Sequence, residues 1–405
     1  MTTGVGSRKV LFVCDGRWYA GPETFLREFS RHLPSCGWNC RMLLTGSRRG
    51  NFDVSEWPCD FEVLPTQYSW KRYSRNLANA ISKCGADVVL TTPLVGAYSA
   101  MRYLYHSGQR VPRLMDTVHS DAEPEYGRVL ANLDVTTAVG VVSDAIAQGA
   151  KAYDDRLRAK VFRIYCPVSC RITPPERQLG CYRRLRIAFV GVLRQPCKRV
   201  LDLIPLAKEL LQARVDFSLS VIGDGPEKQH LQHTILGMPG TADRVTFHGF
   251  VKHKEVLRLL QEHDVLVLVS ETEGQPFAVL EAMEAGVVPI ATDLLGVREV
   301  IQQGETGYLV PIGDMREMAT RIAELAGSRD RLCEMGVRGW EFIRGTHASE
   351  IAASRLAETL DEVAALPVPP REGVRDVAYG GVMERVGVPD FVQYWKRRFL
   401  QQEVH

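Results

Sequence analysis

The length, composition and charge of the chain exclude several classes of protein. With 405 residues, 45% of them hydrophobic and 24% charged, the chain can form two ordinary domains and is too apolar for a disordered protein. The 50 basic and 48 acidic residues leave a formal net charge of +2, without the positive excess that nucleic-acid-binding proteins use. We therefore expect a globular protein with no nucleic-acid partner.

Short apolar runs alternate with helical segments in the first half of the chain. After the first run, Phe25, Phe29 and Leu33 stand at positions i, i+4 and i+8, which predicts a helix with one core-facing stripe. Such alternation is typical of a parallel sheet covered by helices. The strands predicted here are residues 10–14, 40–44, 61–64, 87–91, 113–118, 136–142 and 161–164.

The same alternation restarts after a joint near residues 166–184 that contains three prolines. Proline opposes the continuation of helices and strands, so the joint is predicted to be a hinge. Residues 200–213 and 254–263 have the spacing of helices. The strands predicted in this half are residues 185–190, 217–222, 245–247, 265–269, 287–291 and 307–310.

The two series predict an α/β protein with two Rossmann-like, doubly wound parallel-sheet domains. We expect these domains at residues 1–175 and 176–365, with a C-terminal tail at 366–405 that packs back on the first domain or forms a loosely ordered appendage. Ligands of such sheets bind beyond the carboxyl ends of the strands, so two facing units would place a site in the cleft between them.

The cysteines and the N-terminal segment favour a cytoplasmic protein. The ten cysteines are spread along the chain without a CxxC pair, which indicates neither a disulfide framework nor a zinc site. The apolar run at residues 10–14 is too short for a secretory signal, and no run reaches the roughly 18 apolar residues of a spanning helix.

Two carboxylates separated by seven residues follow the predicted strand at 265–269. Glu273 falls in the loop after the strand, and Pro276 suits the first turn of a helix, so Glu281 is expected about one turn into that helix. The backbone N–H groups of Gly274 and Gln275 and the helix N-terminus would offer partial positive charge to hydroxyl or phosphate oxygens. Taken alone, the two acids could also be an ordinary solvated pair.

The stretch SETEGQPFAVLEAMEAGVVPI, residues 270–290, resembles the E(x)7E segment of retaining glycosyltransferases of family 4. Members of that family have the GT-B fold and transfer a sugar from a nucleotide diphosphate. Residues 189–204 resemble the family's glycine loop with its phosphate-binding lysine, and residues 221–227 and 247–251 resemble its next two strand-end loops. Residues 292–314 resemble the segment that closes its C-terminal domain.

The resemblance implies roles for individual residues. Lys198 and Arg194 would stabilise the departing diphosphate, Glu273 would lie beside the transferred sugar, and Glu281 would accept hydrogen bonds from the ribose. Here Val192 replaces an arginine that is common in the family, and Lys198 lies one residue later than usual. The other expected donor-binding residues are Gly191, Gly225, Phe250, Gly274, Gln275, Pro276 and Phe277.

The resemblance extends to three residues of the first half. His119 follows the predicted strand at 113–118, where the family often has a histidine, and a ring N–H there could bond the sugar. Gly21 and Glu23 belong to a segment similar to the family's first glycine loop, which would approach the phosphates or the acceptor. A structural histidine and a surface lysine are the ordinary alternatives for His119 and Lys198.

The implied reaction is a retaining transfer from a UDP- or GDP-linked sugar to a small-molecule, glycan or lipid-linked acceptor. The chain has no DxD triplet and no clear nucleophile, so we expect same-face attack without a metal or other cofactor. The alternatives are an epimerase or hydrolase on the same fold, or a non-catalytic homologue that only binds nucleotide sugar. Basic aromatic patches at residues 70–75 and 394–399 could touch an anionic membrane, although solvated helix faces are favoured.

Overall fold

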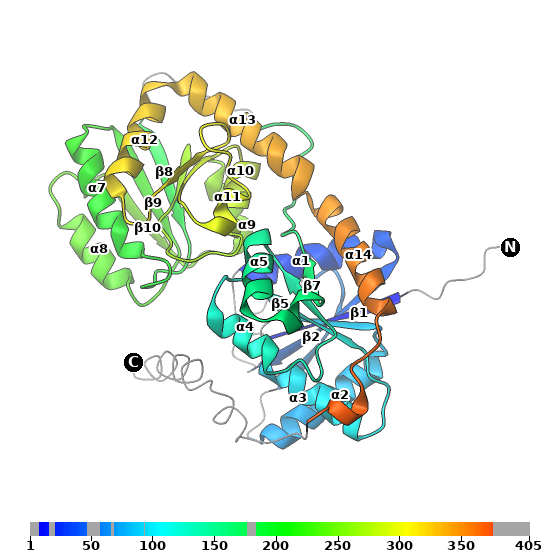
Figure 1. The fold of residues 1–405 in the computed structure, drawn as a ribbon. Coiled ribbons are helices and arrows are strands. Elements are labelled where there is room, and N and C mark those ends of the chain that lie inside the picture. The colour runs from blue at the N-terminus through cyan, green and yellow to red at the C-terminus, as the bar shows by residue number, and fades with distance from the viewer. Residues whose placement is uncertain are drawn as a thin grey trace. The chain divides into compact units, whose positions relative to one another are not determined.

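The computed structural model describes residues 8–15, 21–46, 57–65, 69–92, 94–175 and 184–375. The chain divides into two compact units, one made of Met1–Pro167 with Ala352–His405 and the other of Val168–Ile351. Figure 1 labels many of the helices and strands of both units. The basic aromatic patch expected at 394–399 lies outside the described residues.

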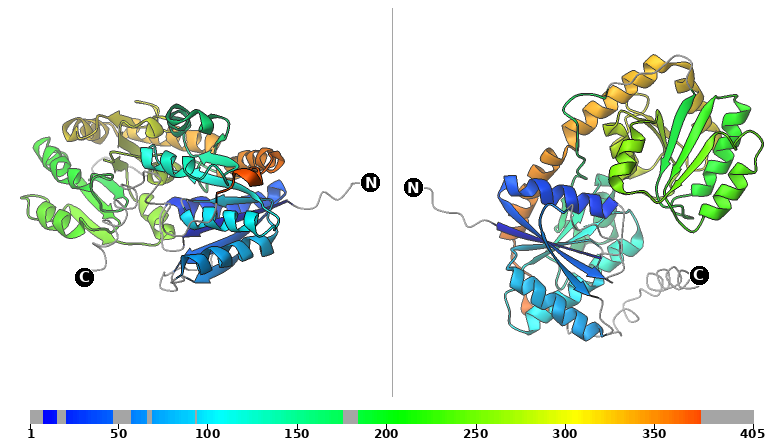
Figure 2. Two further views of the ribbon diagram at one scale, coloured as in Figure 1. Left: turned by 60° about the horizontal axis from the view of Figure 1, so that its bottom comes forward. Right: turned by 180° about the vertical axis from the view of Figure 1, so that it is seen from behind.

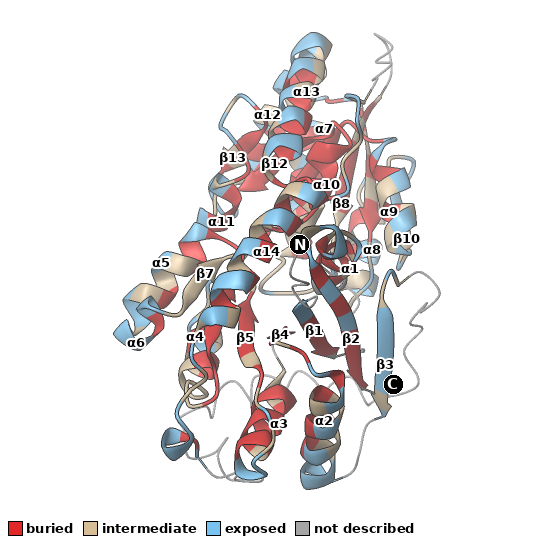
Figure 3. Cartoon of the chain, turned by 90° about the vertical axis from the view of Figure 1, so that its right-hand side faces the viewer, coloured by how far each residue is buried: buried red, intermediate tan, exposed pale blue. Residues whose placement is uncertain are grey.

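The first unit contains a parallel sheet of seven strands within the described residues, in the order β3-β2-β1-β4-β5-β6-β7. The chain winds outward from β1 in one direction and returns to build the other half, which is the doubly wound order expected. Edge strand β3 is largely exposed (Figure 3). The strands are β1 (Arg8–Asp15), β2 (Trp38–Gly46), β3 (Asp60–Pro65), β4 (Val88–Thr91), β5 (Arg113–Val118), β6 (Ala138–Val141) and β7 (Val161–Arg163).

Helices follow most strands of the first sheet, and the helical stripe predicted from the sequence is confirmed. Phe25, Phe29 and Leu33 are fully buried, because residues three and four apart share one face of a helix. The helices are α1 (Gly21–His32), η1 (Leu33–Cys36), α2 (Trp70–Cys84), α3 (Val95–His106), α4 (Glu123–Leu130), α5 (Asp144–Tyr153) and α6 (Asp155–Arg158).

The second unit repeats this architecture with a parallel sheet of six strands in its described part, in the order β10-β9-β8-β11-β12-β13. Figure 2 shows these strands from behind, with helices on both faces. The strands are β8 (Leu185–Val190), β9 (Phe217–Ile222), β10 (Val245–Gly249), β11 (Val265–Leu268), β12 (Val288–Thr292) and β13 (Tyr308–Val310). The helices are η3 (Val200–Asp202), α7 (Leu203–Gln212), α8 (Lys228–Leu236), α9 (His253–Leu260), α10 (Phe277–Glu284), α11 (Leu295–Arg298), α12 (Met315–Gly327) and α13 (Arg329–Thr346).

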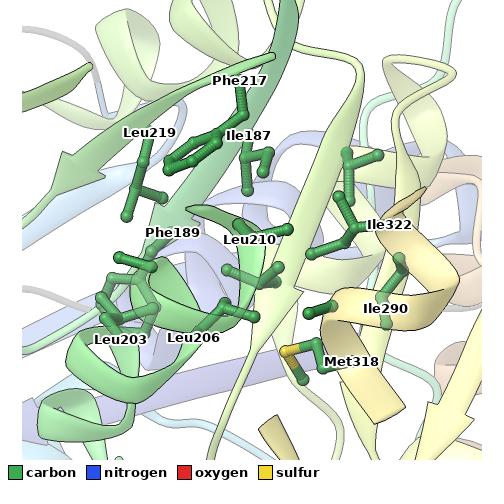
Figure 4. Packing of buried hydrophobic residues seen from close by; sticks show 14 of the residues in the cluster. Ile187, Phe189, Leu203, Leu206, Leu210, Phe217, Leu219, Ile290, Met318 and Ile322 are labelled. Atoms are coloured by element: carbon green, nitrogen blue, oxygen red, sulfur yellow. The ribbon is translucent and has the colours of Figure 1, made fainter. Parts of the chain in front are cut away.

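The core of the second unit holds the strands in place beneath their terminal loops. Leu203, Leu206 and Leu210 share one face of α7 and are fully buried with Phe217 of β9 and Ile187 of β8. Figure 4 shows these side chains together. Burial of each such side chain stabilises the fold by about 1.5–3 kcal/mol, so the sheet is a firm support for the loops at its edge.

The C-terminal part of the described chain returns to the first unit. Helix α14 (Ser349–Ala365) begins in the second unit and continues into the first at Ala352. Beyond it, Arg113 donates to the carbonyl of Leu366 at 3.0 Å, and Val374, just after η4 (Arg371–Gly373), is buried in the first unit's core. The first unit is therefore built from two separate stretches of sequence.

The expected joint near residues 166–184 is described up to residue 175. Val168 bridges to Ala348, its N–H donates to the carbonyl of His347 at 2.8 Å, and its carbonyl accepts from the N–H of Ser349 at 2.9 Å. The first residue of the second unit is therefore hydrogen-bonded to residues near the unit's C-terminal end.

Candidate functional site

The loops after β8, β9 and β10 lie side by side at the carboxyl edge of the second sheet. Parallel strands end at the same edge, which places their terminal loops together. Backbone hydrogen bonds join these loops and the strand ends beside them, from Gly191 N to Ile222 O at 3.0 Å, from Leu193 N to Asp224 O at 3.0 Å and from Gly223 N to Gly249 O at 2.9 Å. The expected site residues Gly191 and Gly225 lie in this connected layer.

Gly225 is required by the close approach of two backbones. A Cβ at this position would lie 2.4 Å from the carbonyl oxygen of Leu193, well inside van der Waals contact. Because the obstacle is backbone and not a flexible side chain, the loops would have to separate to admit any other residue. The glycine allows the loops after β8 and β9 to touch.

Glu273 follows β11 and forms an ion pair with Lys198 from the loop after β8. Lys198 Nζ donates to Glu273 Oε1 at 2.6 Å, with the two side chains 30% and 9% exposed. The backbone N–H of Glu271 donates to the carbonyl of Cys197 at 2.9 Å and so joins the two loops. The structure therefore brings together two of the predicted catalytic residues, which are 75 positions apart in sequence.

Ser270 forms a hydrogen bond with the carboxylate of Glu273. Its buried hydroxyl donates to Glu273 Oε1 at 2.6 Å, and its own carbonyl accepts from Thr292 Oγ1 on the neighbouring strand at 2.6 Å. A carboxylate that accepts two charge-assisted or hydroxyl hydrogen bonds on one oxygen has little freedom to rotate. Ser270 and Thr292 thus connect the carboxylate to the sheet.

Glu281 lies on α10 and is paired with a histidine at the start of α9. Its side chain is 7% exposed, and Glu281 Oε1 lies 2.7 Å from His253 Nε2. As expected, Glu281 stands about one turn into a helix, although Pro276 precedes the first helical residue, Phe277, instead of occupying the first turn. Between the two acids, Gly274, Gln275 and Pro276 are buried and Phe277 is half-buried.

Two further expected residues lie in the loops of the same edge. Phe250 follows β10 and is 62% exposed, and Arg194, which is half-buried, follows Leu193 in the loop after β8. The neighbouring Asp224 accepts from Lys228 Nζ at 2.7 Å, and this hydrogen bond, with bonds from the backbone N–H groups of Gly225 and Phe250, lowers the pKa of the carboxyl group.

His119 follows β5 in the first unit and is a neutral base. Burial lowers the pKa of its imidazole to about 4. The hydroxyl of Thr117 donates its proton to the carbonyl of Thr91 at 2.9 Å, so His119 Nε2, 3.0 Å from that hydroxyl, must be the donor. The remaining Nδ1 is then an acceptor, whereas the resemblance implied that a ring N–H would face the sugar.

A buried charged cluster is centred on Asp116 of β5, the strand that His119 follows. Asp116 accepts from the hydroxyl of Tyr98 and from Arg128 Nη1, and both charged side chains are almost fully buried. Arg128 also donates to Glu125 at 2.9 Å. This cluster ties β5 to α3 and α4 and so holds the strand that carries His119.

The remaining residues expected in the first unit, Gly21 and Glu23, begin helix α1. Their side chains lie outside the described residues. In the described ranges, no group of three His, Cys, Asp or Glu side chains is arranged to hold a metal ion. Among the same residues, no helix combines the length and apolar character that crossing a membrane requires.

Three residues at the second-unit edge were not singled out from the sequence. Ser270 and His253 contact the two acids, and Gly296 on α11 lies against the Glu273 loop, where a Cβ would be 1.7 Å from the carbonyl oxygen of Gly274. All three come shortly after predicted strands. Only this position in the sequence could have indicated that they lie near the site. Their contacts depend on tertiary structure.

Comparison with known proteins finds a family match within the second unit. Residues 184–328 match the family described as glycosyl transferases group 1. The matched stretch includes Lys198, Glu273 and Glu281 with every other expected residue of the second unit.

Curated relatives match over part of their length. N-acetyl-alpha-D-glucosaminyl L-malate synthase of Bacillus anthracis is 35% identical over 158 residues, 39% of this chain and 40% of that protein. Alpha-D-kanosaminyltransferase of Streptomyces kanamyceticus is 32% identical over 255 residues, 61% of this chain and 65% of that protein. The chain thus spans about 40% to 65% of the length of these curated relatives.

A solved structure matches over nearly the whole chain. The Anabaena protein Alr3699/HepE, solved in complex with UDP-glucose, superposes with a TM-score of 0.73 at 17% identity, covering 87% of this chain and 99% of that one. At this identity the likeness concerns the fold, with its two parallel-sheet Rossmann-like domains. We conclude that the chain has the GT-B fold and that its residues 184–328 are similar to the glycosyl transferases group 1 family.

Proposed function

We propose that this protein is a retaining glycosyltransferase of family 4 that moves a sugar from a nucleotide diphosphate to an acceptor hydroxyl. The observation that carries the proposal is the pair of Lys198 and Glu273, which unites two strand-end loops of the group 1 domain at 2.6 Å. A cation held beside a carboxylate at the edge of a parallel sheet suits a ligand with a leaving phosphate and a polar sugar. Arg194 supplies a second cation from the same loop.

The proposed chemistry is same-face substitution at the anomeric carbon. The bond from this carbon to the β-phosphate oxygen breaks, the bond to the acceptor oxygen forms on the same face, and the acceptor proton passes to the departing phosphate. Lys198 keeps two of its three ammonium donors after bonding Glu273, and these stabilise the charge that develops on the phosphate. No metal ion takes part in this proposal.

The proposed donor site runs along the edge of the second sheet. Glu281 accepts from the ribose hydroxyls, the loops carrying Gly191 and Gly225 approach the phosphates through their backbones, and the segment from Gly274 to Phe277 contacts the sugar. The names of the relatives support a sugar-transferring role, and the complex of Alr3699/HepE with UDP-glucose makes a UDP-linked sugar the first donor to test. GDP-linked sugars are the second.

The acceptor is proposed to bind in the first unit, where His119 offers a neutral Nδ1. This nitrogen can accept a hydrogen bond from a hydroxyl group of either substrate. The acceptors to test are small molecules, glycans and lipid-linked sugars.

The test is a product assay after a nucleotide screen. A nucleotide that binds only the native protein raises its melting temperature, so a thermal screen with UDP and GDP identifies the base. UDP-glucose, UDP-N-acetylglucosamine and GDP-mannose are then incubated with acceptor mixtures, and the anomeric configuration is read by NMR. An α-linked product from an α-linked donor supports the proposal.

Other outcomes of that assay contradict it. An inverted product excludes the retaining mechanism, and free sugar formed equally with and without acceptor indicates a hydrolase. Binding of nucleotide sugar without any turnover identifies a non-catalytic homologue, the reading that Val192 in the glycine loop favours. Loss of turnover on treatment with a chelator, restored by Mg²⁺ or Mn²⁺, refutes metal independence.

A further inference from the structure

A histidine outside the E(x)7E segment contacts one of its two acids. His253 is the first residue of α9 and lies 2.7 Å through Nε2 from Glu281 Oε1. Helices α9 and α10 pack against each other (Figure 1), and the contact joins the first residue of α9 to a residue within α10. The side chain of His253 is 30% exposed, whereas that of Glu281 is 7% exposed.

The buried carboxylate of Glu281 requires a hydrogen-bond donor as its partner. Removing a carboxylate from water carries a large penalty unless hydrogen bonds or an opposite charge compensate for it. An ionised carboxylate only accepts hydrogen bonds, so Nε2 of His253 is the donor. One N–H occupies one of about four lone-pair sites of the carboxylate, which leaves Glu281 able to accept further hydrogen bonds.

We propose that His253 is a positioning residue for nucleotide binding: its Nε2–H orients Glu281 so that the remaining lone pairs accept from the two ribose hydroxyls of the donor. This inference rests on the proposed function. A carboxylate can accept from both hydroxyls of adjacent ribose carbons only in a defined orientation. The hydrogen bond from His253 on the neighbouring helix would keep the Glu281 side chain in that orientation. His253 thus contributes to the preference for a ribonucleotide over its deoxy form.

The experiment measures nucleotide affinity in the full-length protein by calorimetry. The probes are UDP and GDP, followed by the 2′,3′-dideoxy form of whichever binds. The variants are His253→Ala, which removes the donor, His253→Gln, whose amide N–H can replace it, and Glu281→Gln. His233→Gln on the exposed side of α8 is the matched control.

For the ribonucleotide, His253→Ala is expected to bind about tenfold more weakly, in keeping with the loss of one charge-assisted hydrogen bond. His253→Gln is expected to recover to within about threefold of wild type, and His233→Gln to match wild type. The dideoxy nucleotide should bind wild type and His253→Ala equally, because it lacks the hydroxyls that Glu281 would hold. In His253→Ala combined with Glu281→Gln, affinity should equal that of Glu281→Gln alone.

Turnover separates positioning from a general loss of structure. The donor KM of His253→Ala should rise while kcat stays near that of wild type, and circular dichroism should be unchanged. Equal weakening for the ribonucleotide and its dideoxy form overturns the inference, because it would mean general damage to the site. Unchanged ribonucleotide affinity in His253→Ala also overturns the inference, but it leaves the proposed function intact. If wild type binds neither diphosphate, the proposed function itself fails.

Discussion

At the scale of single residues, the most informative contact is the one between Lys198 and Glu273. The lysine is 30% exposed, so an ordinary surface ion pair would contribute little to stability. The ion pair matters because of its position, since it places the ammonium group of Lys198 next to the proposed sugar and phosphate sites. A functional role and a surface role therefore predict different results for the same substitution.

Replacement of Lys198 by methionine keeps most of the aliphatic stem and removes the charge. We expect kcat/KM for the nucleotide sugar to fall by the equivalent of about 2–5 kcal/mol, as when one partner of a desolvated charge pair is lost. The melting temperature should change little. Lys208→Met, on the exposed side of α7, is the control, and wild-type turnover in Lys198→Met would remove the lysine from the mechanism.

His119 predicts a pH dependence of stability. Its pKa is lowered to about 4 in the folded protein from an ordinary value of 6.5, so between these values the unfolded state binds more protons. The free energy of unfolding should therefore fall as the pH drops from about 6.5 to about 4, by up to about 3 kcal/mol from this group. His119→Gln should remove that part of the slope, and the exposed His230→Gln should not. Parallel curves for wild type and His119→Gln between these pH values would contradict the burial argument.

At the scale of elements, the strands could be predicted from the sequence, whereas most contacts of the site could not. Runs of Val, Leu and Ile predict buried strands because both faces of a parallel sheet are covered. The ends of each expected strand lie within two residues of the observed ends. The loops that follow them were therefore correctly assigned to one edge. Partners such as His253 and Glu281, or Ser270 and Thr292, belong to elements that are distant in sequence, and local patterns do not encode which side chains meet.

Helix α11 packs on the Glu273 loop through Gly296, where backbone meets backbone. A Cβ there would lie 1.7 Å from Gly274 O, so Gly296→Ala should displace the loop, lower stability by about 1–3 kcal/mol and reduce donor affinity. Gly345→Ala in α13, where a Cβ meets nothing within 4 Å, is the control and should be neutral or stabilising. Chemical denaturation and nucleotide titration of both variants check this, and equal behaviour of the two would refute the close approach.

The buried pair of Asp116 and Arg128 joins β5 to α4. Asp116→Leu leaves the guanidinium buried without its main partner, and a loss of about 3–5 kcal/mol in unfolding free energy is expected. Adding Arg128→Met removes the stranded charge and should recover much of the loss. Urea denaturation measures both, and a double variant less stable than the single one would show that the cluster is held by its other contacts.

At the scale of the whole molecule, the first unit depends on residues near the end of the chain. Leu356, Leu360 and Val363 of α14 are almost fully buried, and Val374 lies in the core of the first unit. Which unit a helix joins cannot be predicted from its periodicity, because an apolar stripe does not specify its partner surface. The division of α14 between the units is thus information that only the structure supplies.

Truncation tests this dependence. A chain ending at residue 351 should lose the cooperative unfolding of the first unit, while a chain ending at residue 375 keeps every contact named above and should retain it. In calorimetry, the transition that UDP or GDP shifts upward should survive in both. Retention of two full transitions in the shorter chain would contradict the assignment of residues 352–375 to the first unit's core.

The bridge between Val168 and Ala348 has a consequence for biosynthesis. The second unit is one uninterrupted stretch whose two ends are hydrogen-bonded to each other, so every part of it has been translated by the time residue 351 is added. The strands of the first unit are translated earlier, but the unit is incomplete until α14 and the segment after it have been translated. During translation, the unit whose synthesis begins first is therefore the last to be completed.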